Sequence, residues 1–596
     1  MFPPQSRYST KESQARAVVD PRSGDMEDDA SSTKSRSLLS LAGSLLAEMS
    51  LPKLVVAWLS LVVVPALALG LVPLIASAWI AAVSRKLSSP IRLWPILVLA
   101  ILFAFAWYGA RALYRVAETG FWALNSLVVE PGYVTCREVL RHFAEALVPS
   151  EMKDVQFARL RAATALVAGL IVSALAVYVV TLVWPHSHWT ATVSYFTAPF
   201  RVAAAALANS VVLVAGYFAG ASLAWGIADA TMTQPRDLDG FSSCPPEDRT
   251  WRIAHLSDIH VVGERYAFRI ESGRSGPKGN QRLQQAMAQL ESLCEKEQLD
   301  LILVTGDMTD AGSSAEWAEL LDILALHPRL AQRMLILPGN HDLNIIDRAN
   351  PARIDTPASP KSRLRKVRAL SAISTLQGER VHIVDHARGQ LGLTLTQSLE
   401  PHYAEIARFA DVARPLLSTA LARLWNDVFP MVLLPDSTDG LGVILLNSNA
   451  DTHFSFTNAM GMIATEQMKG IKIAMAQYPQ ACWVVALHHH VVEYPRAAKA
   501  LSDRIGTALI NGHWFVRQLQ RFSERVIVMH GHRHTDWIGK CADLVIVSAP
   551  SPVMEGADAL DTHFWIHTVA IGADGRLRLL APERICLPGQ RNGHAA

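Results

Sequence analysis

Five short segments in the second half of the chain carry the residue types that bind transition metals. They are Asp258-Ile259-His260, Gly306-Asp307-Met308-Thr309-Asp310, Gly339-Asn340-His341-Asp342, His488-His489-His490 and Gly531-His532-Arg533-His534. Taken singly, each segment can be explained as a turn or a packed histidine, and Asp258-Ile259-His260 alone is a weak signal. Together, in this order and each after an apolar run, they favour a shared metal site.

The ligand types restrict the metal and its chemistry. Imidazole and carboxylate ligands without thiolate suit Mn, Fe or Zn rather than Ca²⁺ or Cu(I). Two such cations, about 3.5–4 Å apart, would clamp a phosphate, lower the pKa of a bound water and stabilise an in-line displacement. The predicted cofactor is therefore a pair of divalent or trivalent metal ions, in a site that hydrolyses a phosphate ester.

Short apolar runs must position these segments. Six runs are predicted strands: Ile253–Leu256, Leu301–Thr305, Met334–Leu337, Val443–Leu446, Trp483–Leu487 and Val526–Met529. Helical patterns alternate with them from residue 251 onward, which indicates an α/β domain. Because functional sites of α/β sheets gather at the carboxyl ends of strands, we expect the polar segments to converge there.

The pattern DIH, GDMTD, GNHD, HHH and GHRH resembles the calcineurin-like metallophosphoesterases over about residues 250–550. The phrase RIAHLSDIH and the run from GDMTDAG to LPGNHD are most similar to the branch that includes class III cyclic-nucleotide phosphodiesterases. The resemblance implies a four-layer α/β/β/α sandwich. It also implies an enzyme, a hydrolase of phosphomonoesters or phosphodiesters that uses a water activated by two metals.

The resemblance further implies a role for each polar residue. The metal ligands would be Asp258, His260 and His534 for the first ion, Asp307 as the bridge, and Asn340, His488 and His532 for the second. His341 would be the catalytic histidine, protonating the leaving group or stabilising the transition state, and Asp342 would orient it. His489 stays open as the alternative to His488. Asn447 stands where relatives often carry Asp.

The first half of the chain has the composition of a membrane region. Charged residues make up only 18% of the chain, and the deficit lies between residues 54 and 228. Uncharged stretches there reach the length of roughly 20 residues that spans a bilayer. They are Leu54–Ser84, Leu93–Ala110, Ala162–Trp184 and Val202–Ala228. We expect about four helical spans within residues 51–230, the first of them kinked or re-entrant at Pro65 and Pro73.

The distribution of Lys and Arg predicts the orientation of these spans. Residues 111–161 carry seven Lys and Arg, whereas residues 185–200 carry none. This pattern predicts a multi-pass integral membrane protein with a cytoplasmic catalytic domain. Arg85, Lys86 and Arg92 disagree with it, because they would lie in a short outside loop.

The remaining segments complete the predicted organisation. Residues 1–50 are expected to form a disordered polar tail, 231–249 a linker and 250–585 the metallophosphoesterase domain. The long segment 343–440 is expected to form a helical cap over the site. Its basic residues would either contact an anionic substrate or lipid headgroup, or form a solvated face. They are Lys361, Arg363, Arg365, Lys366 and Arg368.

Composition also bears on the partners. The net charge is only +2 and no basic run is interleaved with aromatics, so no nucleic-acid partner is expected. The six cysteines are scattered without a CxxC pair, which argues against a disulfide framework. The expected partners are a phosphate-ester substrate, either a cyclic nucleotide or a lipid-linked phosphate, and membrane lipids. The alternative function is a membrane-anchored sensor or regulatory protein with a degenerate phosphoesterase domain.

Overall fold

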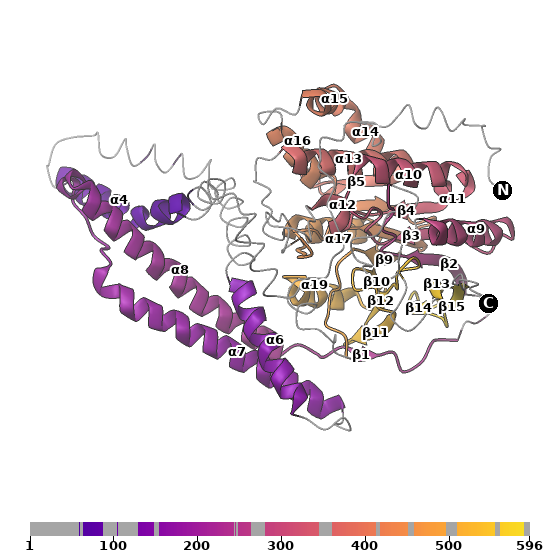
Figure 1. Cartoon of the computed structure of the whole chain (residues 1–596), viewed down its shortest axis with the longest axis horizontal. Coiled ribbons are helices and arrows are strands. Elements are labelled where there is room, and N and C mark those ends of the chain that lie inside the picture. The colour runs from indigo at the N-terminus through magenta and orange to yellow at the C-terminus, as the bar shows by residue number, and fades with distance from the viewer. Residues whose placement is uncertain are drawn as a thin grey trace, which may run out of the picture. The chain divides into compact units, whose positions relative to one another are not determined.

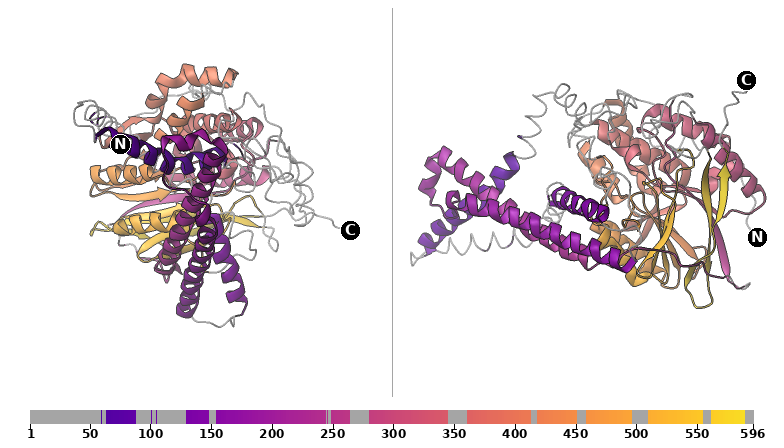
Figure 2. Two further views of the ribbon diagram at one scale, coloured as in Figure 1. Left: turned by 90° about the vertical axis from the view of Figure 1, so that its left-hand side faces the viewer. Right: turned by 60° about the horizontal axis from the view of Figure 1, so that its bottom comes forward.

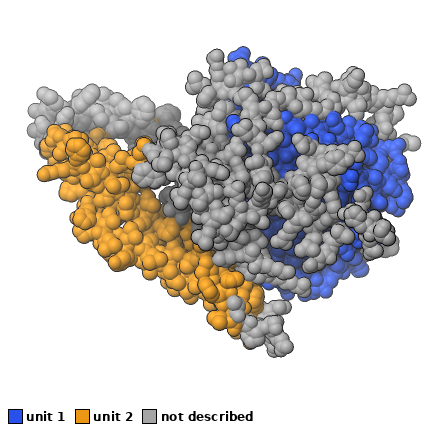
Figure 3. Space-filling view, in the orientation of Figure 1, with its two compact units in different colours: residues 1–49, 233–498, 506–596 blue, residues 50–232, 499–505 orange. Residues whose placement is uncertain are grey.

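The computed structural model of the chain falls into two compact units. It describes residues 63–87, 129–147, 154–243, 248–263, 280–344, 360–412, 418–450, 458–495, 509–554 and 561–588, with the single residues 59, 100, 104 and 245. One unit takes residues 1–49, 233–498 and 506–596, and the other takes residues 50–232 and 499–505 (Figure 3). The predicted tail lies outside the described residues, and the predicted domain boundaries stay predictions.

The unit of residues 50–232 is helical where it is described. Its elements are α4 (Val64–Leu87), α6 (Glu130–Ala146), α7 (Asp154–Val183), η3 (Trp184–His186), η4 (Val193–Thr197) and α8 (Pro199–Ala230). Three helical segments are long and apolar enough to cross a membrane, namely Val64–Ala82, Gln156–His186 and Pro199–Ala230. They match three of the predicted stretches. The fourth, Leu93–Ala110, lies outside the described residues except for positions 100 and 104.

Small residues let α7 and α8 pack closely side by side (Figure 1). A Cβ atom on Gly169 would lie only 2.7 Å from the carbonyl oxygen of Ser222 and 3.0 Å from Cα of Gly226. Such small-residue contacts are typical of helix pairs in membranes. At the end of α8, buried Asp229 accepts a hydrogen bond from Tyr133 and pairs with Arg137 of α6 at 2.5 Å. These partners compensate the buried charge.

The other unit is built on two mixed sheets. The larger has the strand order β1-β11-β12-β10-β9-β8-β7-β5-β6, and the smaller has the order β14-β13-β2-β3-β4 with β15 paired to β13. The strands are β1 (Arg236–Asp237), β2 (Arg249–Leu256), β3 (Leu301–Val304), β4 (Met334–Ile336), β5 (Val381–Asp385), β6 (Gln390–Thr394), β7 (Met431–Leu433), β8 (Leu441–Leu445), β9 (Cys482–Ala486), β10 (Val526–His530), β11 (Trp537–Cys541), β12 (Leu544–Ser548), β13 (Thr562–Ile571), β14 (Leu577–Leu579) and β15 (Glu583–Leu587). All six predicted strands are present, as β2, β3, β4, β8, β9 and β10.

Helices cover the outer faces of the two sheets (Figure 1 and Figure 2). The helices described in this unit are α9 (Gln281–Glu295), α10 (Ser314–Ala325), α11 (Pro328–Arg333), α12 (Asn340–Leu343), α13 (Pro360–Gln377), α14 (Leu395–Leu399), η5 (Glu400–His402), α15 (Tyr403–Val412), α16 (Ser418–Asp427), α17 (Thr465–Gln477), α19 (Gly512–Leu519) and η7 (Gln520–Phe522). Helices α9 and α11 pack on the smaller sheet and α17 on the larger. One apolar core joins Leu256 and Ile302 of the smaller sheet to Val484 and Ile527 of the larger. The predicted α/β sandwich is confirmed.

Residues 343–440 do not form a purely helical cap. Strands β5, β6 and β7 join the edge of the larger sheet, and α13 buries Leu370 and Ile373 in the core. The prediction relied on the length of the segment and missed three strands of only three to five residues. A solvated basic face is also wrong for part of α13, because Arg365, Lys366 and Arg368 are 3%, 9% and 1% exposed.

Candidate metal centre

The five polar segments lie directly after β2, β3, β4, β9 and β10. Strands β2, β3 and β4 run parallel in the smaller sheet, and β9 runs parallel to β10 in the larger sheet. Parallel neighbours present their carboxyl ends at the same edge of a sheet. The three segments after β2, β3 and β4 therefore lie at one edge of the smaller sheet, and the two after β9 and β10 lie at one edge of the larger sheet.

Backbone contacts tie these loops together. Asp258 N donates to Gly306 O at 3.1 Å, and His260 N donates to Asp307 O at 3.0 Å. Gly306 has a φ of 98°, and a Cβ atom there would collide with Nδ1 of His488. A glycine is thus needed at this position both for its backbone conformation and for the close approach of the imidazole.

Left-handed backbone conformations are concentrated at this site. Seven described non-glycine residues have positive φ, and five of them are predicted ligands. These are Asp258, His260, Asp307, His532 and His534, with φ between 46° and 75°. Such conformations are uncommon outside glycine and cost about 1–3 kcal/mol each, so they persist where the surrounding structure enforces them. In DIH the two residues lie in the same ligand group, whereas in HRH His534 joins Asp258 and His260, and His532 joins Asp307 and His488.

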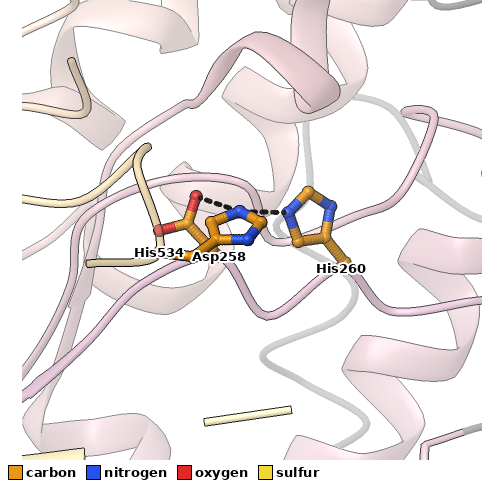
Figure 4. A group of neighbouring side chains, drawn as sticks. All are labelled: Asp258, His260 and His534. Carbon is orange, nitrogen blue, oxygen red and sulfur yellow. Dashed lines mark hydrogen bonds and ion pairs between the residues drawn. The ribbon is translucent and has the colours of Figure 1, made fainter. Parts of the chain in front are cut away.

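The first ligand group contains Asp258, His260 and His534 (Figure 4). Nε2 of His534 lies 3.3 Å from Oδ1 of Asp258 and 3.3 Å from Nε2 of His260. The potential ligand atoms of the three residues all lie within 4.8 Å of one another. Asp258 and His260 are fully buried, and the His534 side chain is 24% exposed.

The second ligand group contains Asp307, His488 and His532. Nε2 of His488 lies 3.2 Å from Oδ2 of Asp307 and 3.1 Å from Nδ1 of His532. Asn340 joins the group, because its Oδ1 lies 3.1 Å from the same nitrogen. Oδ2 of Asp307 also lies 3.8 Å from Nε2 of His260 in the first group. All seven predicted ligands are therefore brought together, with Asp307 between the two groups.

The donor set fits a pair of cations. Two imidazole pairs, His260–His534 and His488–His532, face each other through ring nitrogens at 3.3 and 3.1 Å. Facing lone pairs repel unless a proton or a cation lies between them. Burial, then His341, lowers the pKa of His260, and burial, then His489, lowers the pKa of His532 far below its usual value. Neutral imidazoles and buried carboxylates are the forms that bind transition metals.

Asp307 and His488 of the second group shift each other's pKa. Burial alone would raise the pKa of this carboxyl, but His488 and then His341 hold it well below its usual range. Burial would likewise lower the pKa of His488, yet Asp307 raises it to about 9. The carboxylate thus attracts positive charge at this position, which a metal ion would supply in place of the His488 proton.

Supporting hydrogen bonds orient the ligand atoms. Nδ1 of His488 contacts the carbonyl oxygen of Thr305 at 2.8 Å, which leaves Nε2 facing the group. Oδ2 of Asp258 accepts from His532 N at 2.9 Å, and Oδ1 of Asp307 accepts from His341 N at 2.8 Å. Each carboxylate therefore keeps its other oxygen toward the imidazoles. Such outer contacts are typical of metal sites.

The histidine triplet separates into different environments. Only His488 belongs to a ligand group among the described residues. Nδ1 of His489 bonds the hydroxyl of Ser448 at 2.9 Å, and that hydroxyl also accepts from the backbone N–H of His488 and of His489. This geometry favours His488 over His489 as the ligand.

The sequence prediction missed a role for Asp310. Nδ1 of His341 lies 2.7 Å from the carbonyl oxygen of Asp310, and Nδ1 of His260 lies 3.3 Å from its carboxylate. Asp342, predicted to orient His341, accepts hydrogen bonds from the backbone of Gly339 and from Thr309. The bonds from Thr309 tie Asp342 to the loop that carries Asp310. The sequence did offer one signal for this role of Asp310: it is a second Asp, three residues after Asp307, in the same GDMTD segment.

Comparisons with known proteins show what this chain is similar to. The family model described as calcineurin-like phosphoesterase matches residues 252–536. A probable cyclic nucleotide phosphodiesterase of Coxiella burnetii is 30% identical over 108 residues, which cover 18% of this chain and 38% of that protein. A crystal structure of a dimetal phosphatase from Danio rerio is 12% identical, with 57% of this chain and 99% of that chain covered and a TM-score of 0.32.

Proposed function

Because residues 252–536 belong to the calcineurin-like phosphoesterase family, we propose that this chain is a metal-dependent phosphoesterase anchored in a membrane. Its ligands are Asp258, His260 and His534 for one ion, Asn340, His488 and His532 for the other, and Asp307 between them. The observation that carries the proposal is the concentration of left-handed backbone at five of these seven residues. A fold that keeps such strain in one place favours a functional reason for it.

The metal pair, when bound, supplies Lewis-acid activation of water and neutralises charge on the phosphate. The ions proposed for this mixed ligand set are Mn, Fe or Zn. The chain's own residues orient the reaction. Asp307 lies between the two ligand groups. Backbone hydrogen bonds join the loop after β2 to the loop after β3, which carries Asp307.

His341 is the proposed general acid. Its Nδ1 is held against the carbonyl oxygen of Asp310, so Nε2 is the nitrogen that can carry a proton to the leaving oxygen. Its ring packs edge-on against His260 at 4.4 Å between centroids, which fixes it beside the first ligand group. A positioned acid of this kind contributes about 10²- to 10⁴-fold to the rate.

The substrate is proposed to be a phosphate ester encountered at a membrane. The Coxiella relative suggests a cyclic nucleotide, and the apolar helices suggest a lipid-linked phosphate. Turnover of these two substrate classes by the same detergent-solubilised protein would separate them. The proposed placement of the catalytic unit is cytoplasmic, in line with the Lys and Arg distribution.

Replacement of Asp307 tests the proposed function. The full chain, purified in detergent and supplied with Mn²⁺, is expected to hydrolyse an aryl phosphate ester. Asp307→Asn is expected to reduce this activity by more than about 100-fold, because even supporting partners of metal ligands contribute about 10- to 100-fold. Metal content, measured by elemental analysis, is expected to fall in parallel. An active Asp307→Asn protein would refute the assigned site, and a metal-free, inactive wild type would favour a degenerate domain.

A further inference from the structure

Arg533 lies between two proposed ligands but has no place in the ligand set. It follows His532 and precedes His534 in the loop after β10, so its backbone is held from both sides. The backbone N–H of Arg533 donates to the carbonyl oxygen of Gly531 at 3.0 Å. The position of its Cα is therefore set by the same loop that presents imidazoles to both ligand groups.

The Arg533 side chain is buried and held at one end. It is 8% exposed, and its Nη2 lies 3.2 and 3.3 Å from the two carboxylate oxygens of Glu493 and 3.1 Å from Nε2 of His490. The His490 ring stacks on His532 at 6.0 Å with only 10° between the planes. His490 contacts both the Arg533 guanidinium and the ring of His532, so it holds the guanidinium near the second ligand group.

These contacts leave hydrogen-bonding capacity at the other nitrogens. A guanidinium carries five N–H donors in a planar fork, and all of its side-chain contacts to described residues involve Nη2. Nε of Arg533 is buried and has no hydrogen-bond partner among the described residues. A buried donor without a partner is costly, so the arrangement is expected to be completed by a ligand.

A structural ion pair alone explains the arrangement less well. Arginine and carboxylate form their strongest pair through two parallel N–H···O bonds from two nitrogens. Glu493 instead takes both contacts from the single Nη2. Glu493 therefore anchors the guanidinium through Nη2 alone, and the N–H groups of Nε and Nη1 stay available for a second anion.

We propose that Arg533 is a substrate-binding residue that donates hydrogen bonds to a non-bridging oxygen of the phosphate held at the metal centre. Glu493 and His490 are positioning residues that fix its guanidinium. The inference rests on the proposed function and deepens it, because it names the phosphate group itself as what this side chain recognises. Guanidinium geometry matches phosphate oxygens, and its charge adds to that of the metal pair.

Binding of inorganic phosphate tests this inference without relying on turnover. The metal-loaded full chain in detergent would be titrated with inorganic phosphate by calorimetry, with metal content measured on the same samples. Arg533→Gln is expected to raise the dissociation constant by about 10- to 100-fold with both metals retained, the range for hydrogen bonds to a charged group. Arg533→Lys is expected to recover part of the affinity, because it restores the charge without the fork.

Arg521→Gln is the matched control, because Arg521 is an exposed arginine of η7. It is expected to leave phosphate affinity unchanged. Unaltered phosphate affinity in Arg533→Gln would overturn the inference, as would loss of metal from that variant or a wild type that binds no phosphate. A wild type that binds metal and phosphate but hydrolyses no ester would instead refute the proposed function while leaving the Arg533 comparison intact.

Discussion

At the residue scale, neighbouring histidines with the same chemistry differ in what they face. His488 directs Nε2 into the ligand group, whereas Nδ1 of His489 bonds Ser448. We expect His488→Ala to bind fewer metal ions per chain and to lose more than about 100-fold in activity, since even supporting contacts contribute about 10- to 100-fold. His489→Ala is expected to keep its metals. Elemental analysis of both variants checks this, and the reverse pattern would assign His489 as the ligand.

A second residue-scale prediction concerns His567 on β13, whose ring lies 5.7 Å from that of His255 on β2 between centroids. Both of its ring nitrogens are buried without a hydrogen-bond partner among the described residues, and burial lowers its pKa to about 4. The unfolded chain, with a histidine pKa of about 6.5, binds this proton more readily. The stability that neutral His567 contributes is therefore present above pH 6.5 and is lost as pH falls toward 4.

His567→Phe is expected to remove this pH dependence. Relative to wild type, the variant should gain stability as pH falls, by at most about 1.4 kcal/mol for each pH unit. Urea unfolding of the full chain in detergent at pH 7.5, 6.5 and 5.5 measures the difference. A difference that does not change with pH would show that His567 keeps an ordinary pKa in the folded protein.

At the element scale, α13 supports the loops of the site from behind. Arg368 is fully buried and donates to the carbonyl oxygen of Gly312 at 2.9 Å, and Arg365 donates to that of Leu343 at 2.9 Å. These carbonyls directly follow the loops that carry Asp310 and His341. Helix α13, predicted as part of a cap, thus anchors the loops of the candidate site.

Arg368→Met is expected to lower activity by about 10-fold and stability by about 1–3 kcal/mol, because the Gly312 carbonyl loses a charged donor. Arg329→Met is the control, since Arg329 is 67% exposed and its pair with Glu295 at 3.9 Å is worth at most about 1 kcal/mol. Thermal unfolding and ester hydrolysis by the full chain measure both effects. If Arg368→Met and Arg329→Met showed the same stability and activity, Arg368 of α13 would not support the loops of the site.

At the scale of the whole molecule, the proposed orientation is open to direct labelling. Ser194 is exposed in η4, between α7 and α8, in the segment without Lys or Arg, and Cys586 is exposed on β15. In intact cells, a membrane-impermeant maleimide is expected to label Ser194→Cys but not the wild-type protein. Both should be labelled after permeabilisation. Labelling of wild-type cysteines in intact cells would place the catalytic unit outside.

The sequence by itself determined the elements that are encoded locally. Five apolar runs, each followed within a few residues by a polar segment, predicted β2, β3, β4, β9 and β10. The polar segments contain Asp258, Asp307, Asn340, His488 and His532. These strands were predictable because each strand and its turn are specified by adjacent residues. The apolar stretches predicted α4, α7 and α8 for the same reason. Length and composition, however, could not show that β5, β6 and β7 extend a sheet.

Only the tertiary structure decided which side chains meet. The choice between His488 and His489, the contact of Asp310 with His341, and the burial of Arg365, Arg368 and Arg533 all depend on residues far away in the chain. Side-chain direction after a strand depends on backbone φ, and five of the proposed ligands take the left-handed value that sequence patterns do not encode. Hydrogen bonds between loops distant in the chain, such as those from Asp258 N to Gly306 O and from His260 N to Asp307 O, hold the backbone at two of these residues.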